Sequence, residues 1–315
     1  MKVLVTGADG FVGRHLVRRL AAEGHDVAGA RRPAGAHEPI ADPTLAGVRW
    51  LPLELTDPAS VAAAAEHAAD AVVHLAAVSS NAEALGDPDE AWNVNAVGVV
   101  RLLRALAARR ALGAADPVVL LVSSAEVYGR GEPRPRREED PPAPLTPYAA
   151  TKAAAELAGL EVWRRTGLRV IIARPFQHTG SGQTTRFVLP AFAQRLRSAR
   201  ASEARTVPTG NLTPVRDFLD VRDVVAAYLL LLERGEPGGT YNVARGEGVS
   251  LGDMFVQLAR ILGVRAEPVP DPALERRTDI PHLVGDAGRL RRVTGWAPVH
   301  SLDDMLRDLA DAEAH

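Results

Sequence analysis

The sequence predicts an α/β fold built around a doubly wound parallel sheet. Short apolar or β-branched runs alternate with longer stretches rich in Ala, Leu and Arg through the first two-thirds of the 315 residues. Such alternation is typical of strands and helices that form a parallel sheet covered on both faces. Beyond about Arg174, glycine and proline become frequent and the alternation stops. The length suits about two domains, or one large α/β domain with a smaller appendage.

The alternating region contains six expected strands and four expected helices. The expected strands are Val3–Val5, Asp26–Gly29, Val48–Leu51, Ala71–His74, Val118–Ser123 and Arg169–Ala173. The expected helices are Gly13–Glu23, Ser60–Ala68, Trp92–Arg110 and Pro147–Arg165. From Arg130 to Pro144 the chain is polar and rich in proline, which predicts an exposed loop at the border of a site.

Composition argues against several classes of protein. The 37 Lys and Arg nearly balance the 39 Asp and Glu, for a formal net charge of −2, so we expect neither a nucleic-acid surface nor a polybasic membrane patch. The absence of cysteine excludes disulfides, thiolate zinc sites and thiol nucleophiles. No His, Asp and Glu group has metal-ligand spacing, so we expect no metal. Without a signal sequence or a run of about 18 uncharged apolar residues, we expect a cytoplasmic globular protein with no membrane segment.

The first expected strand leads into a turn with three glycines. Gly7, Gly10 and Gly13 have a GxxGxxG spacing, with Phe11 and Val12 between the last two glycines. An amphipathic helix follows. The first glycine permits the tight turn, the second lets backbone approach a pyrophosphate, and the third allows the helix to pack closely on the strand. The N–H groups at the start of the helix then face the phosphates. This arrangement predicts a Rossmann-type dinucleotide site.

The residues after the second strand indicate which dinucleotide binds. A site for NAD(H) places an acidic residue there, on the adenine ribose, whereas this chain has Arg31 and Arg32. Two guanidinium groups suit a 2′-phosphate, so NADP(H) is favoured over NAD(H). The alternative is that both arginines face solvent. Asp57 either accepts a hydrogen bond from the adenine amino group or caps the next helix.

Tyr148 and Lys152 form a Tyr-x-x-x-Lys pair, which places them on one face of an expected helix. A phenol with a pKa of about 10 is a poor acid or base at neutral pH, and a neighbouring ammonium group lowers that pKa. Ser124, at the end of an expected strand, shares the proton of the reacting oxygen with Tyr148. The three residues predict reversible hydride transfer at a carbinol carbon, with Tyr148 as the general acid or base.

At this point the chain resembles the extended short-chain dehydrogenases/reductases, the epimerase/dehydratase group that acts on nucleotide sugars. The segments that carry the resemblance are VTGADGFVG, HLAA (74–77), NVNAVG (93–98), VSSAEVYG (122–129), YAATK (148–152), ARPFQHTGSGQ (173–183), VRDFLDVRDVV (215–225) and GGTYNVARGEGVS (238–250). The resemblance implies a Rossmann domain over residues 1–173 with parts of 211–245. It also implies a smaller substrate-binding domain over 174–210 and 246–315, and a homodimer.

The resemblance implies further site residues. Besides those already named, the cofactor contacts would include Leu75, Ala76, Ala77, Asn95 and Arg174. The substrate contacts would be Ser79, Ser124, Glu126, Gln177, His178, Val188, Arg216 and Arg277. Arg216 and Arg277 would bind the diphosphate, or would instead pair with nearby acids. Asn95 is equally compatible with a structural amide.

Within the group, the chain is most similar to GDP-4-keto-6-deoxy-mannose reductases. That likeness implies NADPH-dependent reduction of a 4-keto group, with a nucleotide sugar as the substrate. A dehydratase needs an added acid and base, and Ala125 replaces the acid of one dehydratase class, whereas Glu126 keeps a possible catalytic base. The alternatives are a 4-epimerase, a GDP-mannose 4,6-dehydratase, or a non-catalytic dinucleotide-binding regulator. The intact Ser124, Tyr148 and Lys152 favour an enzyme.

Overall fold

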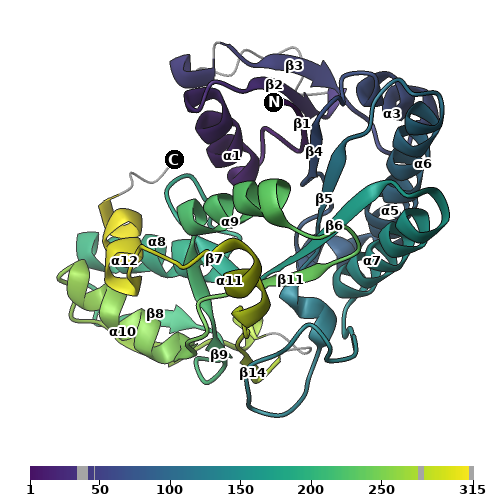
Figure 1. The fold of residues 1–315 in the computed structure, drawn as a ribbon. Coiled ribbons are helices and arrows are strands. Elements are labelled where there is room, and N and C mark those ends of the chain that lie inside the picture. The colour runs from purple at the N-terminus through teal and green to yellow at the C-terminus, as the bar shows by residue number, and fades with distance from the viewer. Residues whose placement is uncertain (34–41, 46, 276–279, 312–315) are drawn as a thin grey trace.

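The computed structural model describes residues 1–33, 42–45, 47–275 and 280–311. Seven parallel strands form one sheet (Figure 1). In spatial order they are β3 (Arg49–Pro52), β2 (Asp26–Arg31), β1 (Lys2–Thr6), β4 (Ala71–His74), β5 (Val118–Val122), β6 (Arg169–Pro175) and β11 (Thr240–Val243). The predicted α/β class and all six expected strands are therefore confirmed, with ends that differ by one or two residues.

Strand β1 is the point where the direction of chain progression reverses. It pairs with β2 on one side and with β4 on the other. In doubly wound sheets, the carboxyl ends of the strands beside such a switch point are the usual place for a ligand. The sequence motifs at the ends of β1, β2, β4 and β5 consequently meet at one edge of the sheet.

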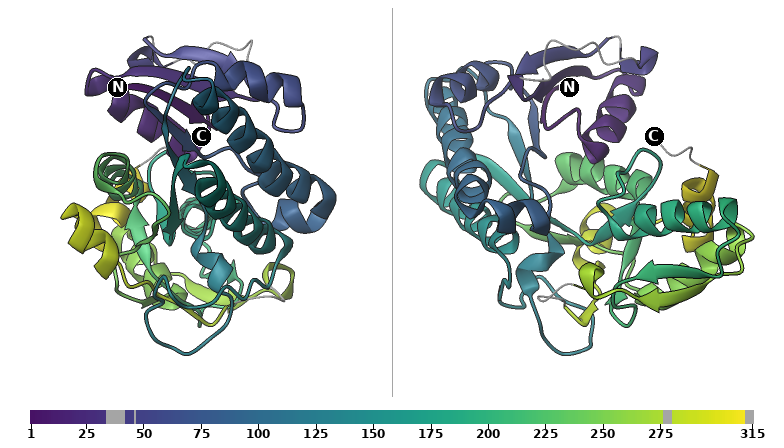
Figure 2. Two further views of the ribbon diagram at one scale, coloured as in Figure 1. Left: turned by 45° about the vertical axis from the view of Figure 1, so that its right-hand side comes forward. Right: turned by 180° about the vertical axis from the view of Figure 1, so that it is seen from behind.

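Helices cover both faces of the sheet, as Figures 1 and 2 show. One face carries α1 (Phe11–Ala22) and α9 (Val221–Arg234), and the other carries α3 (Pro58–Ala65), α6 (Gly98–Ala111) and α7 (Pro147–Thr166). Each face has its own apolar core. Three of the four expected helices agree closely with α1, α3 and α7.

The fourth expected helix, Trp92–Arg110, is not one regular helix. It begins as α5 (Pro88–Trp92), passes through a π-helical turn, η2 (Asn93–Val97), and continues as α6. The extra residue of a π-helical turn rotates the side chains that follow it. Asn95, within this turn, is directed into the protein and is 1% exposed.

The carboxyl-terminal part contains short strands and three helices around a separate apolar core. The helices are α8 (Val188–Ala201), α10 (Leu251–Ile261) and α12 (Leu302–Asp311). Three small sheets accompany them: β7 (Gln177–Thr179) with β10 (Phe218–Asp220); β8 (Thr206–Thr209) with β13 (Glu267–Pro270); and β9 (Val215–Arg216) between β12 (Val249–Ser250) and β14 (His282–Leu283). The remaining elements are α4 (Asn81–Gly86), α11 (Gly288–Thr294), η1 (Pro43–Leu45), η3 (Ala125–Tyr128) and η4 (Pro272–Leu274).

The chain returns to the main sheet after this part has begun. Helix α9 packs beside α1, and β11 adds a seventh strand next to β6. The alternating pattern does not predict β11, because four residues after two glycines carry little periodicity. The domain boundaries given above stay a prediction. No helix among the described residues is both long and apolar enough to cross a membrane.

The glycine turn after β1 is tightly packed. Gly7 has φ +67°, a left-handed conformation that favours glycine. A Cβ on Gly13 would lie 2.2 Å from the Gly7 carbonyl oxygen. Helix α1 therefore approaches β1 more closely than any other residue at position 13 would allow.

We predict that Gly13→Ala lowers the free energy of unfolding by at least about 2 kcal/mol, because the added methyl group must displace backbone. Urea denaturation followed by circular dichroism measures this loss. The matched control is Gly86→Ala in α4, where a Cβ would meet nothing within 4 Å. Equal stability of the two variants would show that the close approach of α1 to β1 is not required.

Candidate functional site

The glycine turn leaves the start of helix α1 available to a ligand. Gly10 precedes the helix and provides no side-chain cap. The first N–H groups of a helix have no partner within it, and they carry the positive end of the helix dipole. A phosphate group fits this place, and the absence of a Cβ at Gly7, Gly10 and Gly13 permits its approach. Phe11 and Val12 form the first turn and are half-buried.

The residues after β4 lie against the same turn. Leu75, Ala76 and Ala77 are half-buried. A Cβ on Gly7 would lie 2.8 Å from the Ala76 nitrogen, so this segment borders the predicted dinucleotide site. The Ala76 N–H donates to the Thr6 hydroxyl over 3.2 Å, which fixes the segment on β1.

The two arginines after β2 differ in their surroundings. The Arg31 guanidinium lies 5.3 Å from the centre of the Trp50 ring and is largely buried. Arg32 is exposed. Asp57 caps α3 by accepting from the N–H groups of Ala59 and Ser60, so its capping role is confirmed, and contact with adenine stays a prediction.

Ser124 and Tyr148 meet at the carboxyl end of β5. Ser124 follows the strand and is 9% exposed, and its hydroxyl accepts from the Glu126 N–H over 3.2 Å. Thr146 caps α7, with Pro147 in its first turn. This cap fixes where α7 begins and so places Tyr148 at the edge of the sheet. A hydrogen bond joins the side chains of Ser124 and Tyr148.

The expected lowering of the Tyr148 pKa is wrong for this structure. Burial raises the pKa of the Tyr148 hydroxyl above its usual value, and the negative charge of Glu126 raises it further, whereas the hydrogen bond with Ser124 lowers it. The Lys152 ammonium group, one helical turn further along α7, donates to the Val122 carbonyl oxygen over 2.9 Å. Tyr148 is therefore protonated at neutral pH, although its raised pKa makes the proton harder to give up.

Lys152 is enclosed below Tyr148 on α7. The residue is 6% exposed, and burial lowers the pKa of its amino group to about 8, against an opposing effect of Glu156. His74, on β4, is also fully enclosed, and burial together with the charge of Lys152 lowers its pKa to about 3. The His74 ring is therefore neutral at physiological pH.

Glu126 has a partner that sequence reasoning missed. The Asn81 side-chain amide donates to Glu126 Oε2 over 2.7 Å, which orients the carboxylate next to Tyr148. Asn81 is the first residue of α4, where a polar residue needs no functional explanation. No sequence signal therefore distinguishes it, and only the fold brings α4 over η3.

Arg174 is paired with a residue of helix α7. Its guanidinium forms a two-point ion pair with Glu156, at 2.9 and 2.7 Å. Both residues are buried, at 5% and 4% exposure. The Arg174 guanidinium is thus held by α7, and its expected contact with the cofactor stays a prediction.

Asn95 is also a structural residue. Its amide oxygen accepts from the Val78 N–H over 2.8 Å, and its amino group donates to the Val78 carbonyl oxygen and the Thr151 hydroxyl. Both donors are thus used within the protein, and none is left for a cofactor. These bonds support the structural interpretation of Asn95, and its contact with a cofactor stays a prediction.

The expected substrate residues lie on several elements. Gln177 and His178 are half-buried on β7, Val188 begins α8, Arg216 is buried on β9, and Ser79 is exposed after β4. His178 Nδ1 donates to the Phe176 carbonyl oxygen, and the ring stacks on Phe11, with ring centres 6.2 Å apart. This contact brings β7 to the start of α1. Arg277 lies outside the described residues.

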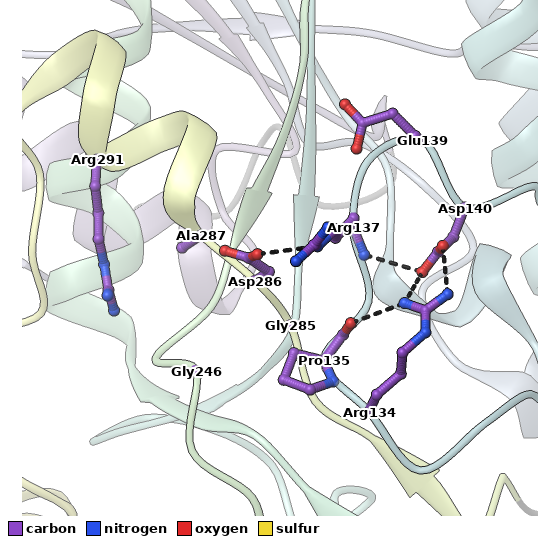
Figure 3. Close-up of a pocket in the computed structure, with 10 residues that line it drawn as sticks. All are labelled: Arg134, Pro135, Arg137, Glu139, Asp140, Gly246, Gly285, Asp286, Ala287 and Arg291. Carbon is purple, nitrogen blue, oxygen red and sulfur yellow. Dashed lines mark hydrogen bonds and ion pairs between the residues drawn. The ribbon is translucent and has the colours of Figure 1, made fainter.

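A hollow lies elsewhere, between the polar loop after η3 and the start of α11 (Figure 3). Its volume is about 860 Å³. Arg134 points to Asp140, and Arg137 points to Asp286. Because these charges are already paired and Ser124, Tyr148 and Lys152 do not line it, this pocket is separate from the candidate site. Among the described residues, no group of three His, Asp or Glu is placed to hold a metal ion.

Comparison with known proteins agrees with this geometry. A profile of the NAD dependent epimerase/dehydratase family matches residues 3–244. The chain belongs to that family. GDP-6-deoxy-D-mannose reductase of Pseudomonas aeruginosa is 37% identical over 97% of this chain and 95% of its own. The resemblance stated from the sequence is therefore confirmed.

Solved structures of family members have the same fold. RMD from Pseudomonas aeruginosa, complexed with NADPH, has a TM-score of 0.82 and 35% identity, covering 98% of each chain. UDP-glucose 4-epimerase of Thermus thermophilus, in complex with NAD, has a TM-score of 0.85 and 30% identity, covering 99% of this chain and 98% of that one. Reductases and epimerases are thus both similar to this chain, so the reaction must be argued from its own residues.

Proposed function

We propose that the protein is an NADPH-dependent reductase of the 4-keto group of a nucleoside-diphosphate 4-keto-6-deoxy sugar, with GDP-4-keto-6-deoxy-mannose as the first candidate. The observation that carries this proposal is the placement of the Tyr148 hydroxyl, which is hydrogen-bonded to Ser124 and one helical turn from Lys152. Reduction of a ketone requires a proton donor, and a phenol can supply one when a neighbouring cation such as Lys152 stabilises the phenolate that is left. The likeness to a GDP-6-deoxy-D-mannose reductase supports the choice of substrate.

The residues then have distinct roles. When bound, NADPH supplies a hydride to C4 of the sugar. Tyr148 donates its proton to the C4 oxygen, so that the ketone gains two electrons and two hydrogens in all. Ser124 donates a hydrogen bond to the same oxygen and holds it within reach of Tyr148. The charge of Lys152 stabilises the phenolate that remains.

Other residues of this chain would bind the cofactor and the sugar. The first N–H groups of α1 suit the pyrophosphate, as the glycine turn allows. Arg32, exposed after β2, suits a 2′-phosphate, and the NADPH bound to the related RMD is consistent with this choice. Arg216 would bind the diphosphate of the substrate, with Glu126, Gln177, His178, Ser79 and Val188 around the sugar.

The second candidate reaction is epimerisation, because a UDP-glucose 4-epimerase is similar over nearly the whole chain. An epimerase removes and returns the hydride within one turnover, so the cofactor is not consumed. A reductase oxidises one NADPH for each sugar. Net loss of NADPH therefore separates the two reactions, and we favour reduction because the identity to the GDP-6-deoxy-D-mannose reductase, 37%, exceeds that to this epimerase, 30%.

We predict that the protein oxidises NADPH when GDP-4-keto-6-deoxy-mannose is added, and that Tyr148→Phe lowers kcat at least about 100-fold because the proton donor is lost. Absorbance at 340 nm measures the rate. Tyr241→Phe is the matched control, since the Tyr241 hydroxyl accepts from the Glu236 N–H away from the site. Sugar interconversion without NADPH loss would favour the epimerase, and cofactor binding without any turnover would favour a regulatory protein.

We predict that Arg32→Met raises the KM for NADPH about tenfold or more and leaves the KM for NADH unchanged, because a charge-assisted contact with the 2′-phosphate is lost. Initial rates with both cofactors measure the effect. Arg49→Met, at the amino end of β3 and also exposed, is the control. An equal KM for NADPH in the native protein and in Arg32→Met would contradict this role.

The expected homodimer is part of the proposal. Three apolar side chains are exposed on the adjacent helical segments η2, α6 and α7: Val97 at 43%, Val100 at 37% and Leu157 at 70%. A second copy of the chain that packs its own α6 and α7 here would cover them. A cytoplasmic location also belongs to the proposal, as the compartment where reduced cofactor is at hand.

We predict a dimer in solution that Leu157→Glu converts to a monomer, because the substitution places charge in an apolar contact. Analytical ultracentrifugation measures the mass. Leu112→Glu, 84% exposed beyond the end of α6, should leave the dimer intact. A monomeric native protein at micromolar concentration would contradict the proposed interface.

A further inference from the structure

Beneath Tyr148 lies a set of buried polar side chains that the proposed reaction does not use. It consists of Ser123, Glu156 and Arg174, which are 3%, 4% and 5% exposed. They come from three elements: the end of β5, the middle of α7 and the end of β6. Buried charge of this kind is costly to a fold unless it is fully paired, so its place next to the site calls for an explanation.

Glu156 is the centre of the set. Its Oε1 atom accepts from the Ser123 hydroxyl over 2.5 Å and from Arg174 Nε over 2.9 Å. Its Oε2 atom accepts from Arg174 Nη2 over 2.7 Å. Three donors hold the carboxylate, which favours its ionised form.

Arg174 is fixed from its other sides. Its guanidinium lies 4.8 Å from the centre of the Tyr128 ring, and Nη1 donates to the Glu138 carbonyl oxygen over 3.3 Å. Tyr128 is in turn held by its hydrogen bond to Asn242, at 2.7 Å. The ion pair is therefore in contact with neighbours on more than one side.

The ion pair is adjacent to Lys152. Lys152 and Glu156 are four residues apart on α7 and so share one face of the helix. The Lys152 amino group donates to the Val122 carbonyl oxygen, and the next residue, Ser123, donates to Glu156. The ammonium group and the carboxylate thus approach neighbouring residues at the end of β5.

We propose that Glu156 is a positioning residue that keeps Lys152 cationic beneath the reacting groups, and that Arg174 keeps the Glu156 carboxylate ionised. The inference concerns the charge of Lys152 and depends on the proposed function only for its consequence in turnover. Along one face of α7, Tyr148 is then the acid, Lys152 is the cation next to it, and Glu156 is the anion that keeps Lys152 cationic.

The electrostatic directions agree with this arrangement. Burial lowers the pKa of Lys152 to about 8, and the charge of Glu156 raises it. The other titratable groups that face Lys152 are Tyr148 on α7 and His74 on β4, and both are neutral at physiological pH. Without the Glu156 charge, the effect of burial would be unopposed and the amine would lose its proton at a lower pH.

The chain suits a direct test, because Lys2 and Lys152 are its two lysines. Protein labelled with carbon-13 at lysine Cε gives two resonances, and Lys152→Arg assigns them. We expect the titration midpoint of Lys152 to fall by about one pH unit or more in Glu156→Gln, since an opposite charge shifts a neighbouring pKa by about 1–3 units. Glu156→Asp should retain most of the native midpoint.

Glu161→Gln is the matched control, because Glu161 lies on the same helix in an exposed pair with Arg165. Its Lys152 midpoint should equal that of the native protein. An unchanged midpoint in folded Glu156→Gln would overturn the proposal. If that variant does not fold, the double variant Glu156→Gln with Arg174→Met removes both charges of the ion pair. The titration midpoint of Lys152 should also fall in the double variant. An unchanged Lys152 midpoint in the double variant would equally overturn the proposal.

The pH profile of kcat/KM for NADPH-dependent reduction tests the consequence. We expect its alkaline limb to move to lower pH in Glu156→Gln by the same amount as the lysine midpoint, and to stay in place in Glu161→Gln. A shifted lysine midpoint with an unshifted profile would overturn the role of Lys152 charge in turnover. Absence of turnover in the native protein would refute the proposed function, while the resonance titration would still decide the role of Glu156.

Discussion

The buried ion pair between Glu156 and Arg174 fixes the relation between helix α7 and the sheet. It joins the middle of α7 to the end of β6, and Ser123 adds the end of β5. Removing one partner of such a pair typically costs about 3–5 kcal/mol, because the other charge is left unpaired. The position of α7 along the sheet sets the position of its first turn. Because Tyr148 lies in that turn, it also sets where Tyr148 lies relative to Ser124.

The same constraint organises the electrostatics of the site. Enclosure raises the pKa of Tyr148 and lowers that of Lys152, so both groups tend to be neutral when buried. Glu126 raises the pKa of the phenol further, and Glu156 opposes the loss of the lysine proton. Two carboxylates at different places on the fold therefore act on the neighbouring titratable groups of α7 in the same direction, toward the protonated form.

Local patterns in the sequence predict much of the fold. The six strands and the glycine turn depend on short-range periodicity and on backbone conformation, as the φ of +67° at Gly7 illustrates. Strand β11 is too short for its periodicity to be recognised. The π-helical turn η2 is also not predicted, because the apolar spacing of the helix continues through it. The motif residues Ser124, Tyr148 and Lys152 are brought together as predicted.

Side-chain direction is what the sequence leaves open. Arg174 lies near the carboxyl end of β6, at the edge of the sheet that carries the site. Its guanidinium nevertheless turns to α7, because Glu156 lies there. Asn95 lies in the π-helical turn and bonds to Val78, and Asn81 reaches Glu126 from the start of α4 only because the chain folds back. Each outcome depends on a partner distant in sequence, which no local pattern contains.

The central claim, reduction at C4 of the sugar, is tested most directly by following the hydride itself. NADPH deuterated at both C4 positions of the nicotinamide is supplied with the 4-keto sugar nucleotide, and the product is examined by mass spectrometry and proton NMR. The account predicts one deuterium per product molecule, at C4 of the sugar, with stoichiometric NADP⁺. A product without deuterium, formed with no net loss of NADPH, would contradict it.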